Sequence, residues 1–298
     1  MKRLLLITSL LFLGLIVIAS VPDDSDAFYK EVEEWHQRRI NALTSETGWL
    51  TLAGLFWLEQ GDNTFGSASD NDLIFPEDMP KYMGSFNLQD SIVTLTVNEN
   101  ISILNDSLSV TKMKLINDHH EDRTDLSYGS YSWYILKRQD KYGIRLKNSA
   151  HQRLKNFTGI DRFPVDIKWR VKAHLEKYDP PKNIKVANVL GQVSEMSSPG
   201  KLHFKFDGKE YTIDPFSSSP GRYWIIFGDK TNEIETYGAG RYLYIDAVDE
   251  NGETYIDFNQ SYNPPCAFTP YSTCTLPPRQ NILDLRVTAG EKSWHGDH

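Results

Sequence analysis

After residue 50 the chain alternates apolar and polar residues and has no long helical periodicity. Residues 93–97 alternate valine and leucine with threonine, as in a strand with one face in a core and one in water. Residues 131–136 and 142–146 predict a hairpin, and Asp207-Gly208 predicts a tight turn between two further strands. We therefore predict an all-β protein, built as an antiparallel sandwich, a barrel or both.

One amphipathic helix is predicted before the strands. Glutamates lie near its start and Arg38 and Arg39 near its end, an order that complements the helix dipole. Phe28, Val32 and Trp35 form an apolar stripe that can pack against a sheet. A polar stretch that follows the strand-rich first part suggests a division of the chain. We expect an N-terminal half at 27–150, with the helix and a sandwich-like set of strands, and a C-terminal β half at 151–298.

Residues 1–19 have the layout of a secretory signal peptide. Lys2 and Arg3 precede a mostly apolar run at 4–18, and Ala19 ends a small-residue pattern typical of a cleavage site. The apolar run is short for a helix that spans a membrane. We therefore expect an exported protein, periplasmic or extracellular. The alternative is an uncleaved segment that anchors the chain, and we expect no other contact with a membrane.

The net charge of −8 and the absence of a basic run make nucleic acid an unsuitable partner, because phosphates would be repelled. Phosphate loops, dinucleotide fingerprints and His-Glu-x-x-His motifs do not occur in the sequence. We expect no cofactor and no metal. With 15 Tyr, 14 Phe and 7 Trp, the chain has enough aromatic residues for a core and for a surface that binds a small molecule.

Asn251-Gly252 is a typical two-residue hairpin turn. With this turn, Asp246 lies directly opposite Asp257, and apolar residues on both strands share the other face. Opposed carboxylates repel each other, so a shared proton would turn them into an acid/base pair. Asp246 and Asp257 are therefore candidate catalytic residues. The alternative is two aspartates that are solvated at the surface.

A proline-rich loop at 262–278 follows this hairpin and contains five prolines. Prolines restrict the backbone, so the loop can hold polar groups in fixed positions beside the sheet. The candidate ligand-binding residues in and near it are Tyr237, Arg241, Asn259, Tyr262, Asn263, Thr269 and Tyr271. The alternative is a structural plug, whose aromatic side chains close one end of a barrel.

The loop also holds Cys266 and Cys274, the two cysteines of the chain. In an oxidising compartment this spacing predicts a disulfide, which would stabilise the fold by about 2–3 kcal/mol in the chain-entropy model. A metal site is a second interpretation, although two sulfurs do not complete a zinc shell. The third interpretation is a free thiol, with Cys266 as a nucleophile.

Several segments together resemble a bacterial family called domain of unknown function 1684 (DUF1684). The segments that carry the resemblance are residues 48–50, 163–165, 227–231, 237–243 and 257–278. They extend over nearly all of residues 28–292, which implies that the two halves act as one unit. The family brings no established reaction with it.

These observations favour an exported protein that binds a small or carbohydrate-like ligand in the cell envelope. The first alternative is an envelope hydrolase that uses Asp246 and Asp257, or Cys266. The second is a structural envelope factor without a ligand. The sequence leaves open whether the protein is an enzyme.

Overall fold

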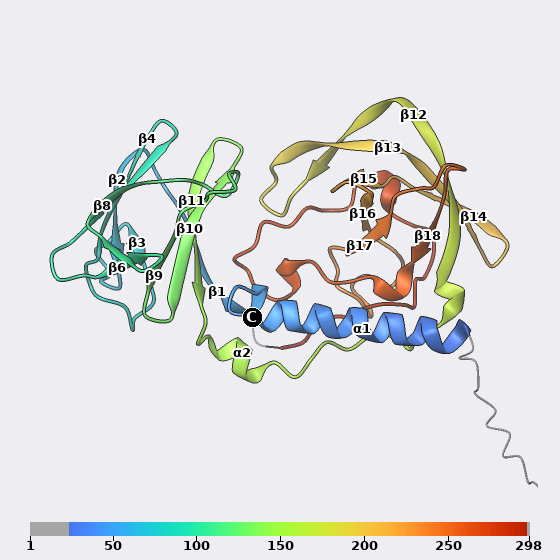
Figure 1. Ribbon diagram of the computed structural model, residues 1–298, viewed down its shortest axis with the longest axis horizontal. Helices are drawn as coiled ribbons and strands as arrows, with labels where there is room; N and C mark the ends of the chain where they lie inside the picture. The colour runs from blue at the N-terminus through green and yellow to red at the C-terminus, as the bar shows by residue number, and fades with distance from the viewer. Residues whose placement is uncertain (1–23, 297–298) are drawn as a thin grey trace, which may run out of the picture.

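The computed structural model describes residues 24–296 and consists of two β lobes side by side, with helix α1 (Asp24–Thr44) along one of them (Figure 1). The predicted all-β class with one N-terminal helix is confirmed. The predicted signal peptide at 1–19 lies outside the described residues. Within the described part of the chain, no helix is both long and apolar enough to cross a membrane.

The first lobe is a sandwich of two sheets. The larger sheet contains β1 (Leu52–Trp57), β11 (Lys141–Asn148), β10 (Tyr131–Arg138), β9 (Asp125–Tyr128), β6 (Ile103–Asn105) and β7 (Leu108–Val110), in this order. The other contains β3 (Leu73–Ile74), β2 (Gly61–Gly66), β4 (Gly84–Gln89), β5 (Ile92–Val97) and β8 (Lys112–Leu115). Phe65, Phe86 and Trp133 are fully or almost fully buried between the sheets. The predicted hairpin of β10 and β11 is confirmed.

The second lobe also pairs two sheets. One has the order β14 (Lys209–Ile213), β13 (Val193–Phe206), β12 (Arg170–Ala187) and β18 (Glu253–Asp257). The other has the order β15 (Phe216–Ser217), β16 (Arg222–Phe227) and β17 (Arg241–Asp246). Trp169 stacks on Phe206 with ring centroids 4.1 Å apart, and Phe258 packs against Trp169 with its edge. Each such buried aromatic side chain contributes about 1.5–3 kcal/mol to the core.

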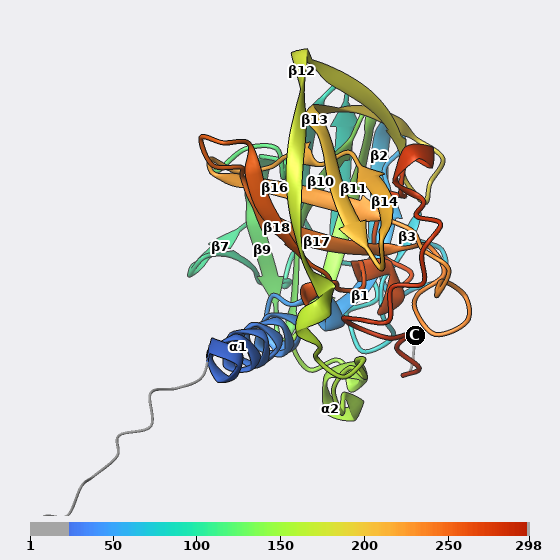
Figure 2. The same cartoon turned by 90° about the vertical axis from the view of Figure 1, so that its right-hand side faces the viewer.

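Strands β12 and β13 are the longest of the molecule, with 18 and 14 residues, and extend furthest from α1 in Figure 2. A break in their register between Lys177 and Lys182 lets the ribbon curve. Its tip returns to the first lobe, where the Gln139 side chain donates to the Val193 carbonyl at 2.6 Å. The two lobes are therefore joined at this tip as well as through the chain.

Helix α1 lies against the second lobe, although the sequence grouped it with the first half. The predicted stripe is confirmed for Phe28 and Val32, which are buried. On the same side, Arg39 pairs with Glu291 at 3.1 Å and Arg162 pairs with Glu33. The short helical turns are η1 (Trp49–Thr51), α2 (Gln152–Asn156), η2 (Ile167–Trp169), η3 (Phe258–Gln260), η4 (Pro265–Ala267) and η5 (Arg279–Asn281).

The predicted ladder between the strands on either side of Asn251-Gly252 is wrong. Strand β17 pairs with β16, and β18 pairs with β12, so the two strands enter different sheets. Asp246 lies opposite Arg222, and Asp257 lies opposite Arg170. The predicted inward face is confirmed for the buried residues Leu243, Ile245, Ile256 and Phe258. These side chains are buried between two facing sheets. This packing, and not the local turn at Asn251-Gly252, determines which strands pair.

Candidate ligand-binding site

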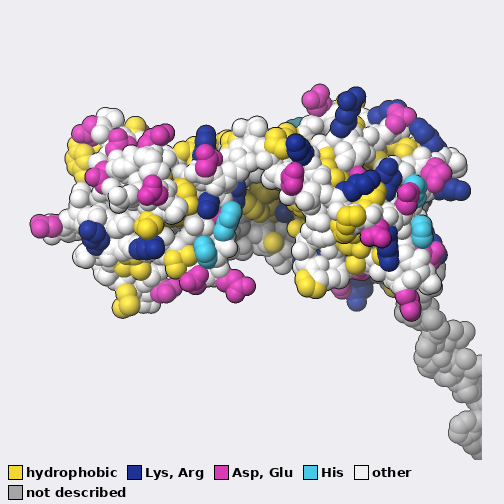
Figure 3. Space-filling view, turned by 90° about the horizontal axis from the view of Figure 1, so that it is seen from above, with side chains coloured by type: hydrophobic (Ala, Val, Ile, Leu, Met, Phe, Trp, Pro, Cys, Tyr) yellow, Lys and Arg dark blue, Asp and Glu magenta, His cyan; other side chains and the backbone are white. Residues whose placement is uncertain are grey.

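A pocket of about 740 Å³ lies between the two lobes. Figure 3 looks down on the hollow between them and shows hydrophobic side chains in its depth. The walls come from α1 and η1, from β10 and β11 of the first lobe, from β16 and β17 of the second lobe, and from the proline-rich loop. A volume of this size suits a small organic molecule.

The pocket is strongly basic, although the whole chain is acidic. Its lining includes five arginines: Arg38, Arg39, Arg138, Arg145 and Arg222. Among residues 24–296, no aspartate or glutamate lines it. Two of the arginines have a carboxylate partner behind the wall, since Arg39 pairs with Glu291 and Arg138 with Asp118 at 2.9 Å. The excess of positive charge favours a negatively charged ligand.

Arg145 is the most unusual of these side chains, because it is buried without an acidic partner. Only 3% of the residue is exposed. In the part of the chain that the structure describes, no carboxylate oxygen lies within 4.0 Å of its guanidinium, and its Nε has no acceptor. Its remaining contacts are long, at 3.3 Å to the Tyr134 hydroxyl and 3.5 Å to Thr273 Oγ1. A buried charge with such weak partners is costly, unless an anion approaches it.

Arg138 and Arg145 both contact the hydroxyl of Thr273. Its Nε donates to Thr273 Oγ1 at 3.2 Å, so two guanidinium groups from adjacent strands converge on one side chain. Asp118 balances only one of the two charges. Guanidinium groups bind carboxylate and phosphate oxygens through two parallel hydrogen bonds. This end of the pocket therefore has the composition of a site for an oxyanion.

An aromatic wall faces this basic region. Tyr244 stacks between Trp224 and Tyr262, with ring centroids 6.1 and 6.2 Å away and interplanar angles of 20° and 15°. Tyr242 packs its edge against Tyr262. The Arg222 guanidinium lies 5.1 Å from the Tyr244 ring centroid. Such a wall offers flat, partly polar surface to a ring.

Two phenols of this wall, those of Tyr242 and Tyr262, are held neutral. Burial is the main cause that raises the pKa of Tyr242 and of Tyr262 above the ordinary value of a tyrosine. The hydroxyl of Tyr242 donates to the Thr275 carbonyl at 2.6 Å. These two phenols therefore add no negative charge beside the arginines at physiological pH.

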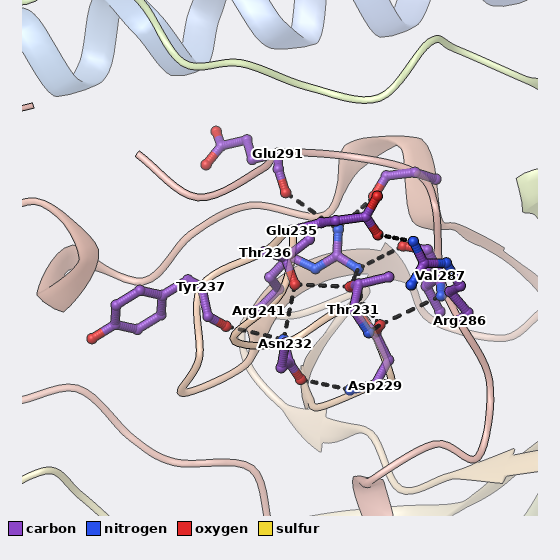
Figure 4. A network of polar contacts seen from close by, with 11 residues as sticks. Asp229, Thr231, Asn232, Glu235, Thr236, Tyr237, Arg241, Arg286, Val287 and Glu291 are labelled. Carbon is purple, nitrogen blue, oxygen red and sulfur yellow. Dashed lines mark hydrogen bonds and ion pairs between the residues drawn. The ribbon is translucent and has the colours of Figure 1, made fainter. Parts of the chain in front are cut away.

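Of the predicted ligand-binding residues, Tyr262 lines the pocket. Arg241 does not, because it is fully buried in a separate polar network, shown in Figure 4. Its Nη2 donates to Asp229 Oδ2 at 2.7 Å and to the Val287 carbonyl at 2.9 Å. Arg241 therefore holds the segment before residue 291 in place instead of meeting a ligand.

The two predicted asparagines also lie outside the pocket lining and hold loops together. Asn259 donates to the Asp166 carbonyl at 3.0 Å. Asn263 donates through its side chain to the Lys292 carbonyl and through its backbone N–H to Glu291 Oε2, both at 2.7 Å.

The remaining residues named from the sequence are Tyr237 and, in the loop, Thr269 and Tyr271. Tyr237 packs beside Phe268, and burial raises its pKa to about 12. Thr269 is buried and accepts a hydrogen bond from the backbone of Tyr271, which is half-buried. None of Tyr237, Thr269 and Tyr271 lines the pocket.

The two candidate catalytic aspartates are not brought together. Asp246 is exposed on β17, whereas Asp257 is buried at the start of η3. Asp257 accepts hydrogen bonds from the backbone and side chain of Asn259, at 3.1 and 2.8 Å. Burial raises the pKa of its carboxyl, against the effect of these bonds. The predicted pairing of Asp246 with Asp257 is therefore wrong, because Asp246 lies opposite Arg222 and Asp257 lies opposite Arg170.

Cys266 and Cys274 are free thiols in the structure and do not form the predicted bridge. The Cys266 N–H donates to Cys274 Sγ at 3.0 Å, and the Ser272 hydroxyl donates to Cys266 Sγ at 2.9 Å. Cys274 also lines the pocket. Within residues 24–296, no three His, Cys, Asp or Glu side chains are grouped so that they could hold a metal ion.

Most of the pocket was not identified from the sequence. Arg38 and Arg39 were explained by the helix dipole, and the arginines of β10, β11 and β16 look like ordinary exposed strand residues. The sequence did contain one indication of the pocket, the two tyrosines on the face of β17 that points away from the core. Tyr242 and Tyr244 lie on this face, and both line the pocket.

Comparisons with known proteins support the resemblance but give no activity. A family model described as "Protein of unknown function (DUF1684)" matches residues 155–292. A solved structure that is similar to the chain is that of an uncharacterised protein from Haloarcula marismortui, determined by NMR in solution. It is 27% identical, with a TM-score of 0.40, and the match covers 47% of this chain and 80% of that one. No curated protein matches. The family match confirms the predicted resemblance over residues 155–292, and the predicted segment at 48–50 lies outside the match.

Proposed function

We propose that the protein binds a small anionic molecule in the pocket between its lobes and does not change it chemically. The observation that carries the proposal is Arg145, a buried guanidinium without a carboxylate partner among the described residues. A ligand carboxylate or phosphate would supply the missing charge. Arg138 and Thr273 lie beside Arg145 and would complete its hydrogen bonds.

The aromatic wall adds a second requirement, because Trp224, Tyr244 and Tyr262 present stacked ring faces to the same space. A ring with an apolar face fits such a wall, and its polar substituents can meet the arginines. The ligand class that meets both requirements is a ring compound that bears a carboxylate or phosphate, such as an acidic sugar. This agrees with the small or carbohydrate-like ligand expected from the sequence.

Binding is favoured over hydrolysis, since none of Asp246, Asp257 and Cys266 lines the pocket. The two aspartates also lie in different sheets. A role as a structural envelope factor without a ligand would leave the unpaired charge of Arg145 without an explanation. The pocket thus supports a ligand better than either alternative.

Export remains part of this proposal. The leader at 1–19 would direct the chain to the periplasm or the outside of the cell, where an oxidising environment would favour a bridge between Cys266 and Cys274. The mass of the protein recovered from the envelope fraction tests this step. We expect a mature chain that begins at Ser20, and a chain that still begins at Met1 in the membrane fraction would indicate the uncleaved anchor.

The binding proposal is tested by calorimetric titration with ring compounds that carry one carboxylate or one phosphate, each beside its uncharged analogue. We expect the anions to bind and the uncharged analogues to bind at least about tenfold more weakly. Arg145→Met should lower the affinity about 30-fold or more, because it removes one partner of a buried charge pair. Arg279→Gln is the matched control, since Arg279 is exposed and lies outside the pocket. Equal binding to Arg145→Met and to the unchanged protein would refute the proposal.

A further inference from the structure

The two sulfurs of the proline-rich loop share one polar cluster. Ser272 Oγ donates to Cys266 Sγ at 2.9 Å and lies 3.5 Å from Cys274 Sγ. The backbone N–H of Cys266 donates to Cys274 Sγ at 3.0 Å. Cys266 begins this cluster in the turn η4, directly after Pro264 and Pro265, whose rings restrict the backbone. The loop therefore holds two free thiols against each other in a fixed frame.

The two thiols differ in access and in protonation. Cys266 is half-buried, whereas Cys274 is buried. Hydrogen bonding from the Cys274 thiol, followed by that from Ser272 and by the charge of Arg145, outweighs burial and lowers the pKa of Cys266 to about 6. The same contact and burial raise the pKa of Cys274. The more accessible sulfur is thus the one favoured as a thiolate and the inner one is favoured as a thiol, the distribution of an attacking and a resolving cysteine.

We infer that Cys266 and Cys274 form a redox-active dithiol that exchanges with small-molecule disulfides, with Cys266 as the attacking sulfur. The inference stands on the hydrogen bonds of this cluster and shares one group, Arg145, with the ligand proposal, because a Cys266 thiolate would balance part of the Arg145 charge.

The exchange proceeds in two balanced steps. The Cys266 thiolate attacks one sulfur of the small disulfide, so that a mixed disulfide forms and one small thiolate leaves. The leaving thiolate takes the proton of the Cys274 thiol. Cys274 then attacks the Cys266 sulfur and releases the second small thiolate, which takes a proton from water. Two protein thiols are oxidised to one bridge, while the small disulfide is reduced to two thiols.

In the resolving step the two sulfurs need only a small movement to meet. Both sulfurs contact the Ser272 hydroxyl, so local rotation of the two side chains brings them together. Ser272 is itself buried and donates to the Thr269 carbonyl at 3.3 Å as an alternative. Its hydroxyl can therefore leave Cys266 when the bridge forms, and no buried donor loses its partner.

Intact-mass measurement with glutathione disulfide tests the assignment of roles. We expect Cys274→Ser to accumulate one glutathione per chain, because its attacking sulfur remains and its resolving sulfur is gone. Cys266→Ser should react at least about tenfold more slowly, since its remaining thiol is buried and protonated. The unchanged protein should lose two hydrogens and retain no glutathione. Equal rates for the two variants, or stable glutathione on the unchanged protein, would overturn the inference.

Ser272→Ala keeps both sulfurs and supplies a test that does not depend on how the cysteine variants fold. The pH at which Cys266 reaches half its maximal rate of alkylation should rise relative to the unchanged protein, because a hydrogen bond to the thiolate is lost. An unchanged pH profile contradicts the role given to Ser272 and to the cluster. A bridge that forms but resists an excess of reduced glutathione would identify a structural disulfide and also overturn the inference.

Discussion

Replacing Arg145 with methionine is expected to stabilise the ligand-free protein while it weakens binding of the anion. The guanidinium is 3% exposed and has no carboxylate within 4.0 Å among residues 24–296. Methionine is apolar and of similar length, so it can fill the same space. The variant therefore removes an unbalanced buried charge without leaving a large cavity.

The size of the effect follows from the contacts. Replacement of buried charged groups by apolar residues of similar volume stabilises proteins by about 1–4 kcal/mol. Against this gain stand the two long hydrogen bonds to Tyr134 and Thr273, each worth less than about 1 kcal/mol. The contact of the guanidinium with the Trp49 ring, at 5.5 Å, contributes about 0.5–1 kcal/mol more. Taken at the middle of these ranges, the balance is a gain of about 1 kcal/mol in the free energy of unfolding.

Arg241→Met is the matched control, because Arg241 is also fully buried but is paired. Its removal would leave the buried carboxylate of Asp229 without its cation. Loss of one partner of a buried pair costs about 3–5 kcal/mol. The two substitutions are chemically identical, but Arg241 has a carboxylate partner and donates to backbone carbonyls, whereas Arg145 has only two long hydrogen bonds among residues 24–296, so opposite signs are expected.

The assay is urea unfolding followed by tryptophan fluorescence, with each transition fitted separately if the lobes unfold apart. Arg145→Met should unfold at a higher urea concentration than the unchanged protein, and Arg241→Met at a lower one. A loss of stability in Arg145→Met as large as that in Arg241→Met would refute the reasoning, because it would mean that the charge of Arg145 is satisfied without a ligand.

Substitutions at three other positions test the aromatic wall, the pair of Arg39 with Glu291 and the buried Asp257. Tyr244→Ala should weaken binding of the ring anion about fivefold to tenfold in a calorimetric titration, and Tyr244→Phe should retain it, because the ring face is kept. Glu291→Gln should lower the free energy of unfolding by about 3 kcal/mol, since the 1% exposed carboxylate pairs with Arg39; an unchanged urea midpoint would contradict this. Burial raises the pKa of Asp257, so its contribution to stability is present below the unfolded pKa and is lost as pH rises through the folded pKa. Urea unfolding at pH 3.5–7, near and above the ordinary value of about 4, should show this loss in the unchanged protein and not in Asp257→Asn.

The parts of the fold that could be predicted are those in which a local pattern reports burial directly. Alternation along β5 and along the β10–β11 hairpin places apolar side chains on one face, and these faces are buried. The same holds for Phe28 and Val32 on α1. In each case the period of the pattern matches the geometry of the element, so no knowledge of distant partners is needed.

The choice of strand partner could not be predicted in this way. Asn251-Gly252 indicates a reversal of the chain, and the chain does reverse there, with Asp249 accepting hydrogen bonds from the Asn251 and Glu253 backbones at 2.9 and 2.8 Å. A reversal, however, does not require the flanking strands to pair. Strand β18 instead pairs with β12, far away in the sequence, because this closes the second lobe over Ile256 and Phe258.

The pocket is formed by residues from both lobes. For this reason it could not be predicted from the sequence, and its positive charge comes mostly from one part of the chain. Residues 155–292, which match the family model, supply the aromatic wall with Arg222 and Thr273, whereas Arg138 and Arg145 come from the first lobe. The region shared with the family therefore provides the ring surface, and most of the positive charge is added by segments before it. It follows that a relative with the same aromatic wall but a different first lobe would bind ring compounds with a weaker preference for a negatively charged substituent. Exchanging Arg138 and Arg145 together for glutamine should accordingly change the preference of this protein from the anionic ring compound toward its uncharged analogue, and loss of both ligands alike would contradict this division of roles.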